Sequence, residues 1–248
     1  MDQKKYLDEI RATQRRSKKM MIENSIHVNT LFLTWQSNRD RNQRYLVGAL
    51  KKLESGFEFS YLAETQDYSD AIDQGFLGYP AFPLDKGPFT NDVMTTFMKR
   101  LPPRSRRDFK KYLVNHHLPE EFDGNDFDLI AHTGVQLPSD GFDLIPSLEE
   151  ADIPFEYLME VAGTRYYLDF EQSSAIQPGS NVSLRCENEN EFDCNAIAMF
   201  VNQTKIGYVN KLFCQTVRKL MEREVDCYVA KVSGTNERPL IYVMLSVS

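Results

Sequence analysis

The sequence ENENEFDCNAI at residues 187–197 leads into the apolar run AMFV, and IGYV follows at residues 206–209 after a short turn. Apolar runs of this length that are bounded by turn residues predict β-strands. The loop before them carries Asn190, Asp193 and Asn195. Their amide and carboxylate groups can hold their own backbone turn or receive the hydroxyl groups of a ligand. The stretch therefore predicts two strands that are entered through a polar loop with a structural role, a binding role or both.

Further strand-like runs lie on both sides of this stretch, and one helical segment, NKLFCQTVRKLMER, interrupts them. Strands are predicted at FEYLMEVAG, RYYLDF, NVSLRC, NAIAMFV, KIGYV, VDCYVAKV and PLIYVMLSV. The pattern is typical of a partly open β-barrel with one or two helices. We place this β-rich domain at residues 151–248, where the acidic segment SLEEADIPFE ends the preceding part of the chain.

The chain before this domain has the pattern of a small antiparallel sheet with helices. LFLTW, RYLVGAL and GFEFSYL predict three strands, and GFDLIP predicts a fourth. We expect helices in DVMTTFMKRL, capped by Thr90 or Asn91, in SRRDFKKYLVNHH, capped by Ser105, and in DFDLIAHTG, which ends at Gly134. The predicted fold class is α+β, with a polar basic arm at residues 1–28, an α+β domain at residues 29–150 and the β-rich domain at residues 151–248.

The charge of the chain restricts where a nucleic acid could bind. The formal net charge is −7, whereas a phosphate backbone attracts surplus Lys and Arg, so a DNA site would have to be local. Positive charge is concentrated in residues 1–20 and 95–111. In the second segment, Phe109 and Leu113 at helical spacing would turn the charges outward. Arg104, Arg106 and Arg107 are therefore candidates for contacts with a protein partner or with phosphate.

Several classes of site find no support in the sequence. The four cysteines have no C-x-x-C spacing, and His116, His117 and His132 lack a third ligand at a fixed spacing, so we expect buried thiols, no metal and no cofactor. The motifs of phosphate-binding loops, serine hydrolases and zinc proteases are missing, so we expect no enzyme. Because no apolar stretch has the length of a membrane span, we expect a cytoplasmic protein without membrane contact.

The order of elements in the β-rich domain resembles the HIRAN family. The shared elements are Arg165-Tyr166-Tyr167, then the loop ENENEFDCNAI, then Ile206-Gly207-Tyr208 before an amphipathic helix. The resemblance covers residues 161–248. It implies a domain that captures the 3′ end of single-stranded DNA without net positive charge over the whole surface.

The resemblance also implies roles for individual residues. Arg165 and Lys211 would contact phosphate, and Tyr166 and Asp193 would hold the terminal sugar hydroxyl. Phe192 and Tyr208 would lie against the terminal bases, where aromatic stacking contributes about 1–3 kcal/mol per base. Asn190 completes the set, as the asparagine that the family carries in this loop.

The chain departs from the family in the same loop. Asn188 and Glu191 stand where the family usually has prolines, and Glu189 adds a further negative charge. Together with Glu187, these carboxylates oppose a phosphate path, most strongly at low salt. They favour an alternative function, in which the protein is an adaptor or an antitoxin-like module that binds protein and has no affinity for DNA.

The N-terminal half resembles the N-terminal subdomain of HipA-type toxin kinases. The resemblance rests on FTNDVMTTFMKRLPPRSR, on FDLIAHTG and on the short strand that follows. It implies a domain that docks another protein, without the kinase core. The leading hypothesis is therefore a bacterial, non-enzymatic protein that binds single-stranded DNA ends through its C-terminal domain and a protein partner through its N-terminal domain.

Overall fold

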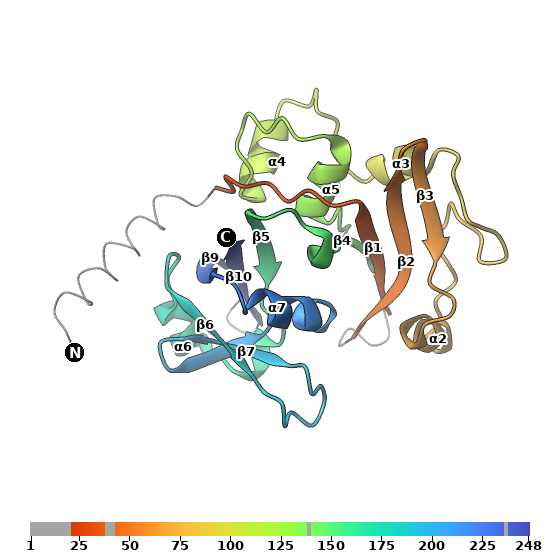
Figure 1. Cartoon of the computed structure of the whole chain (residues 1–248). Coiled ribbons are helices and arrows are strands. Elements are labelled where there is room, and N and C mark those ends of the chain that lie inside the picture. Colours follow the sequence, from red (N-terminus) through yellow and green to blue (C-terminus); the bar gives the residue numbers. More distant parts are fainter. Residues whose placement is uncertain (1–20, 38–42, 138–139, 236–237) are drawn as a thin grey trace. The chain divides into compact units, whose positions relative to one another are not determined.

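The computed structural model describes residues 21–37, 43–137, 140–235 and 238–248, and it divides into two compact units. The first unit comprises Ile26–His116 and Glu120–Asp152. The second comprises Ile153–Ser248 together with His117–Pro119 and the described residues up to Ser25. The α+β fold class is confirmed, because each unit combines small antiparallel sheets with short helices (Figure 1).

The first unit is built on a four-stranded antiparallel sheet with the order β3-β2-β1-β4. Its strands are β1 (Thr30–Gln36), β2 (Arg44–Leu53), β3 (Gly56–Tyr61) and β4 (Phe142–Pro146). All four predicted strands of this half are confirmed. Leu31, Leu33 and Phe59 are buried and give the sheet its apolar side. The ring of Phe59 packs against the rings of Phe82 and Phe97, which come from later segments of the same unit.

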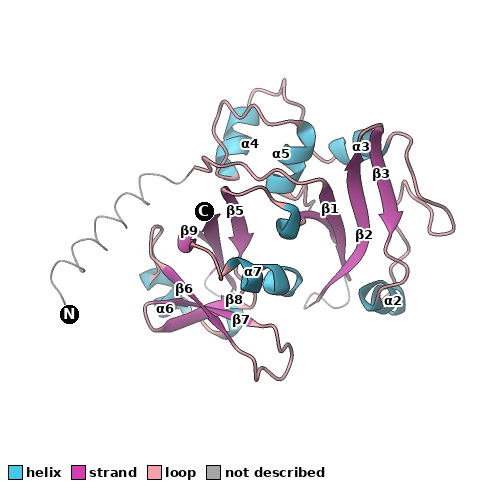
Figure 2. Ribbon diagram, viewed as in Figure 1, coloured by secondary structure: helices cyan, strands magenta, loops and turns pink. Residues whose placement is uncertain are grey.

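Four helices accompany this sheet: α2 (Gln66–Asp73), α3 (Val93–Met98), α4 (Phe109–Asn115) and α5 (Asp126–Thr133) (Figure 2). The end of α5 at Gly134 is confirmed, since this glycine has the left-handed backbone conformation of a C-cap. The predicted N-caps of α3 and α4 are wrong. Asp92 and Asp108 precede these helices instead, and neither makes a side-chain capping bond. Helix α2 was not expected from the sequence.

The second unit contains two three-stranded antiparallel sheets with the orders β5-β10-β9 and β6-β7-β8. The first sheet consists of β5 (Phe155–Glu160), β9 (Val225–Thr235) and β10 (Arg238–Val247), and the second of β6 (Val182–Cys186), β7 (Ile197–Val201) and β8 (Thr204–Tyr208). An isolated bridge from Asn181 to Tyr228 joins the two sheets. The described strands form no closed barrel, in agreement with the partly open arrangement expected.

The helical segment of this unit is confirmed as η3 (Lys211–Phe213) and α7 (Cys214–Leu220). The predicted strand at RYYLDF is wrong. That stretch forms the 3₁₀ turn η2 (Thr164–Tyr166), and helix α6 (Phe170–Ala175) begins at its end. Gly163 has a positive φ that starts the turn, and Asp169 and Gln172 form a capping box that starts the helix. These local signals override the strand-like alternation of the aromatic residues.

The second unit is assembled from distant parts of the sequence. Ile22 and Leu118 are buried in it, and the Ile22 N–H donates to the His117 carbonyl at 2.7 Å. The buried carboxylate of Glu156 accepts hydrogen bonds from the backbone N–H groups of Glu23 and Asn24. Of the segment predicted as a polar arm, residues 1–20 lie outside the described residues, and residues 21–25 are part of the packed unit.

Candidate nucleic-acid interface

A polar network around Tyr208 connects the loop that follows β6 with strand β8. The Tyr208 hydroxyl donates to Glu187 at 2.7 Å, and the Lys205 ammonium donates to Glu187 at 2.8 Å and to the Tyr208 oxygen at 2.6 Å. The amide nitrogen of Asn190 lies 3.1 Å from both Glu187 and the Tyr208 oxygen. The structure thus brings together the predicted residues Asn190 and Tyr208, and it adds Glu187 and Lys205 between them.

Opposite charges compensate one another inside this network. The hydrogen bond from Lys205 lowers the pKa of Glu187 and keeps the carboxylate ionised. Burial disfavours the charge on Lys205, but the hydrogen bonds to Glu187 and Tyr208 raise its pKa. Partial burial raises the pKa of Tyr208 to about 12, so the phenol stays protonated and neutral. The positive charge of Lys205 therefore compensates the negative charge of Glu187. As a result, Glu187 repels an approaching phosphate less than the sequence suggests.

The loop at residues 190–195 is held by its own side chains. The Asn190 side-chain oxygen accepts hydrogen bonds from the N–H groups of Phe192 and Asp193, and Asp193 accepts one from the N–H of Asn195 at 2.8 Å. Both are turns closed by an Asn or Asp side chain. Arg218 on α7 clamps the end of the loop by donating to the Asn195 carbonyl at 3.0 Å. The side chains of Asn190 and Asp193 therefore hold the backbone turns of this loop, which is the structural role considered for them from the sequence.

A close backbone approach places η2 beside β8. Ala162 and Tyr208 exchange two backbone hydrogen bonds, at 2.8 and 2.9 Å. Gly207 allows this approach, because its φ is 140° and a Cβ atom there would lie 2.4 Å from the Ala162 carbonyl oxygen. As a result, the ring of Tyr167 meets the ring of Tyr208 edge to face, with centroids 5.6 Å apart. The Lys205 ammonium lies 4.8 Å from the Tyr167 ring centroid and so contacts both rings.

The remaining predicted residues are exposed around this network. Phe192 is 93% exposed and Tyr166 is 67% exposed, both unusual for aromatic side chains. The guanidinium of Arg165 lies 4.6 Å above the Tyr166 ring and donates to its hydroxyl. Lys211, the first residue of η3, is exposed.

The expected pairing of Tyr166 with Asp193 is not formed among the described residues. Within the described residues, the Tyr166 hydroxyl bonds to Arg165, and the Asp193 carboxylate bonds to the backbone of its own loop. Tyr167 was noted only as part of the Arg165-Tyr166-Tyr167 element, without a role of its own, and Lys205 was not among the predicted residues. Lys205 lies three residues before Tyr208 on β8, and the irregularity in the pairing of β7 with β8 brings both side chains to one face. Tyr167 reaches Tyr208 through the turn that starts at Gly163.

The basic segment around α4 differs from the continuous positive face that was expected. Arg100 is buried and pairs with Asp140, while Arg104 pairs with Asp126 and Arg106 with Asp108. Lys110 pairs with Glu121 at 2.5 Å. Among the described residues, Lys99, Arg107 and Lys111 are the cations of this segment with no ion pair. The segment has cations interleaved with acids, so its positive field is weaker than its composition implies.

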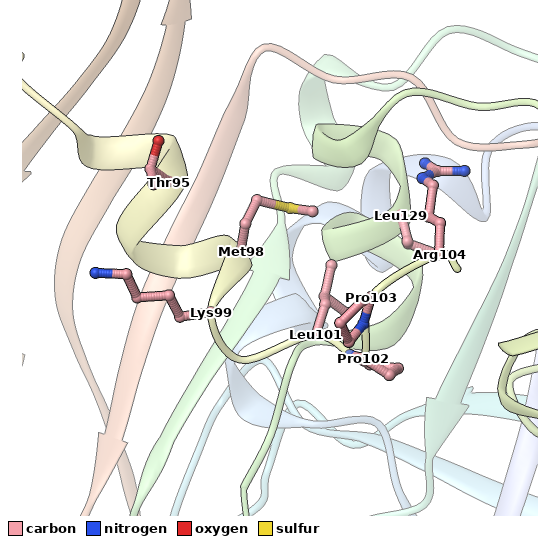
Figure 3. Close-up of a pocket in the computed structure, with 8 residues that line it drawn as sticks. All are labelled: Thr95, Met98, Lys99, Leu101, Pro102, Pro103, Arg104 and Leu129. Carbon is pink, nitrogen blue, oxygen red and sulfur yellow. The ribbon is translucent and has the colours of Figure 1, made fainter. Parts of the chain in front are cut away.

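A shallow groove of about 430 Å³ lies in the first unit between α3 and α5 (Figure 3). It is lined by Thr95, Met98, Lys99, Leu101, Pro102, Pro103, Arg104 and Leu129. Figure 3 shows the Met98 side chain pointing toward Leu129, while Lys99 points away from the other labelled side chains. The groove therefore has an apolar floor with positive charge at its edge.

Further features of the described part of the chain concern metal sites, buried thiols and membrane-spanning helices. It holds no group of three or more His, Cys, Asp or Glu side chains placed to bind a metal ion. The expectation of buried thiols holds for Cys214 and Cys227, whereas Cys186 and Cys194 are exposed. No described helix has the length and apolar character needed to cross a membrane.

Comparison with known proteins identifies the C-terminal part of the chain. Residues 155–248 match the family described as the HIRAN domain. The crystal structure of the HIRAN domain of human HLTF is similar over 37% of this chain and 74% of that chain, with 21% sequence identity and a TM-score of 0.31. A crystal structure of a protein from Lactobacillus plantarum is similar over 36% of this chain and 91% of that chain, with 26% identity and a TM-score of 0.28.

No curated protein matches the chain. The family match at residues 155–248 confirms the predicted HIRAN domain. This match begins six residues before the resemblance noted in the sequence. The resemblance of the N-terminal half to HipA-type kinases receives no support from these comparisons.

Proposed function

We propose that residues 155–248 form a nucleic-acid-binding HIRAN domain that captures the 3′ end of single-stranded DNA, in a protein that binds its ligands without catalysing a reaction. The observation that carries the proposal is the grouping of exposed aromatic and cationic side chains around the Tyr208 network. Phe192 and Tyr166 are exposed, and the guanidinium of Arg165 lies over the Tyr166 ring. Surfaces that bind single strands combine aromatic platforms with cations in this way.

The positions of these residues support a division of roles. The ring of Tyr167 packs on the ring of Tyr208, and the Asn190 side chain is hydrogen-bonded to the Tyr208 hydroxyl. The turn η2 and the loop at residues 190–195 are therefore both fixed to β8. Exposed Phe192 can stack on a base, and Arg165 and Lys211 can approach phosphate. The Asp193 carboxylate accepts one hydrogen bond from the backbone of Asn195 and has further lone pairs. With these it would accept a hydrogen bond from the 3′ hydroxyl of the strand. Tyr166 would turn from Arg165 to the same hydroxyl when DNA binds.

The acidic loop is compatible with this role. Glu187 is compensated by Lys205 at 2.8 Å, which leaves Glu189 and Glu191 as the exposed carboxylates that face solvent. Exposed charges are screened by salt within about 8 Å at physiological ionic strength. We therefore expect binding that is weak at very low salt relative to a basic protein, with a shallow salt dependence set by few phosphate contacts.

Fluorescence anisotropy with the full chain tests the proposal. Labelled ten-nucleotide single strands with a 3′ hydroxyl or a 3′ phosphate, a blunt duplex and an RNA of the same sequence are titrated at two salt concentrations. The 3′-hydroxyl strand should bind at least about ten-fold more tightly than the 3′-phosphate strand, because about 1.4 kcal/mol corresponds to ten-fold. Equal affinity for both ends, or no binding to either, contradicts end capture.

A second candidate function is docking of a protein partner by the first unit, and the groove at Met98 favours it. Its floor is apolar, and Lys99 lies at its edge, with Arg107 and Lys111 in the segment that follows. The partner that fits this chemistry is an acidic peptide segment with an apolar anchor residue. A labelled peptide of alternating Glu and Leu residues should bind, and an otherwise identical Lys and Leu peptide should not.

Two variants of α3 make this second test specific. Met98→Glu places a charge in the groove and should abolish binding of the acidic peptide. Met94→Glu, on the same helix and half-exposed but outside the groove lining, should leave it unchanged. If both variants bind as the unmutated chain does, the groove is not the docking site.

A further inference from the structure

One face of the β6-β7-β8 sheet extends beyond the Tyr208 network. In the strand register, Ala198 lies between Arg185 and Tyr208, and Phe200 lies between Ser183 and Lys205. Side chains of directly opposite residues share one face of a sheet. Arg185 and Phe200 therefore lie on the face that carries Tyr208 and Lys205. Neighbouring strands are about 4.8 Å apart, so the backbones of Arg185 and Tyr208 are separated by about 10 Å.

Arg185 and Phe200 form a cation–π pair on this face. The guanidinium carbon of Arg185 lies 4.2 Å from the centroid of the Phe200 ring. Arg185 is exposed, and among the described residues its guanidinium makes no hydrogen bond and no ion pair. It differs in this from Arg218, whose guanidinium donates to several acceptors of the loop at residues 188–196. The five N–H donors of Arg185 are thus available to a ligand.

We propose that the Arg185–Phe200 pair is a second contact for the bound single strand. This pair receives nucleotides that lie several positions before the 3′ end. This inference rests on the proposed function. It assigns the strand a path from the loop at residues 190–195 across the sheet, past Tyr208 and Lys205, to the outer strand β6. The ligand class is single-stranded nucleic acid, because the pair offers a flat cation that can stack on a base and donors that fit phosphate oxygens.

The physical argument for this contact is preorganisation. An arginine that already lies on a ring loses less conformational freedom on binding than a side chain free in solvent. Because Arg185 is exposed, its guanidinium can receive a base against its plane or phosphate oxygens at its N–H groups. Lys205 has less to offer a ligand, because Glu187 and Tyr208 engage two of its three donors. Arg185 is therefore the cation on this face that is best placed to add affinity.

The test compares strand lengths by anisotropy with the full chain. In the unmutated protein, affinity for 3′-hydroxyl oligothymidine should rise between three and ten nucleotides. Arg185→Gln and Phe200→Leu should each weaken binding of the ten-nucleotide strand by about ten-fold, as expected for one stacked base. Both should bind the three-nucleotide strand as the unmutated chain does, and both should keep the preference for a 3′ hydroxyl over a 3′ phosphate.

Salt dependence separates the two variants from each other. Arg185→Gln removes a phosphate contact and should make the logarithmic salt slope shallower by about 0.7, whereas Phe200→Leu should leave the slope unchanged. Lys231→Ala is the matched control. Lys231 lies 5.8 Å from the Tyr242 ring centroid on the other sheet of the same unit, and its loss should change neither affinity nor slope.

The outcomes distinguish the inference from the function on which it rests. If the unmutated chain discriminates between the two 3′ ends, but Arg185→Gln and Phe200→Leu bind the ten-nucleotide strand normally, the second contact is overturned and end capture stands. If Lys231→Ala weakens binding as much as Arg185→Gln, the effect is one of general charge, and the second contact is again overturned. If the unmutated chain binds no strand of any length, both proposals fall.

Discussion

The carboxylate of Asp193 accepts a 2.8 Å hydrogen bond from the backbone N–H of Asn195, so the residue expected to meet the DNA end also fixes its own loop. Phe192 precedes it on that loop and is almost fully exposed. Removal of the Asp193 side chain would therefore change two things at once, the chemistry of the end pocket and the position of Phe192. A test of end recognition has to keep the turn while it changes the charge.

Asp193→Asn meets this condition, because an asparagine side-chain oxygen can accept the same backbone hydrogen bond. The variant should bind strands with a 3′ phosphate more tightly than the unmutated chain does, since the repulsion between two negative charges is gone. The preference for a 3′ hydroxyl should fall from at least about ten-fold to near unity. Competition anisotropy with the two strands measures the ratio directly.

Two further variants serve as controls for this prediction. Asp193→Ala should lose the preference and also weaken binding of both strands, because the loop is no longer closed. Lys211→Ala should weaken both strands alike and flatten the salt dependence, as expected for a phosphate contact. A preference that survives in Asp193→Asn would remove this carboxylate from the end pocket.

Gly207→Ala should destabilise the second unit by more than about 1 kcal/mol, because the new Cβ would lie 2.4 Å from the Ala162 carbonyl oxygen. Gly56→Ala is a matched control, since Gly56 has a similar φ of 137° but nothing within 4 Å of the added atom. Calorimetry of both variants separates backbone strain from the clash. Equal losses would show that the approach of Ala162 to β8 has little energetic weight.

Arg100→Met should lower the free energy of unfolding by about 3 kcal/mol, although it lies in the segment that was expected to be an exposed basic face. The Arg100 side chain is 7% exposed, donates to both carboxylate oxygens of Asp140 and also reaches the Val135 carbonyl. Arg106→Gln, which breaks an exposed pair with Asp108, should leave the melting temperature unchanged. Urea denaturation of the two variants should give clearly different midpoints; similar midpoints would contradict the structural role of Arg100.

His132 should make the first unit less stable in mild acid. Burial lowers its pKa to about 4, and its Nε2 accepts the N–H of Ile26 at 3.2 Å. The unfolded chain takes up a proton near pH 6.5, whereas the folded chain resists protonation until about pH 4. Stability should therefore fall between these values, by up to about 3 kcal/mol, and level off below them.

The control for this pH dependence is His132→Gln, which can still accept the Ile26 N–H but does not titrate. Its stability should be nearly constant from pH 6.5 to 4. His27→Gln should keep most of the slope. If His132→Gln loses stability with acid as steeply as the unmutated chain, another group is responsible.

Deletion of residues 1–20 and deletion of residues 1–25 should differ in their effect on the second unit. The longer deletion removes the buried Ile22 and two N–H donors of the buried Glu156 carboxylate. We expect it to cost about 2–4 kcal/mol more than the shorter deletion. Thermal melts of the two truncated chains provide the measurement, and identical melting temperatures would show that residues 21–25 contribute nothing.

Much of the fold could be predicted from local sequence patterns. Strands with clear alternation and a helix stop at Gly134 are where such patterns dominate, and they are found as expected. The stretch RYYLDF was misassigned because a positive φ at Gly163 and a capping box at Asp169 decide the local conformation. Helix α2 was missed because it is short, and only Tyr68, Ala71 and Ile72 of its eight residues are apolar.

The candidate site was only partly predictable, for a different reason. Asn190 and Tyr208 were recognised by family resemblance, and they do meet. Lys205 and Arg185 gain their positions from strand register, which brings residues of three strands onto one face. Pairings of this kind depend on the whole sheet and leave no fixed interval in the sequence. The inclusion of residues 21–25 in the second unit is non-local in the same sense.

That inclusion sets an order of events during synthesis. Residues 21–25 leave the ribosome early, but Glu156, which accepts the N–H of Glu23, follows 133 residues later. At the usual 5–20 residues per second, the early segment waits roughly 7–27 s for its partner. During this interval the apolar side chain of Ile22 has no native site to enter. The unit that carries the HIRAN domain can complete its packing only when both distant parts of the chain have emerged, so it closes later than a contiguous domain of equal size that began at the same residue would.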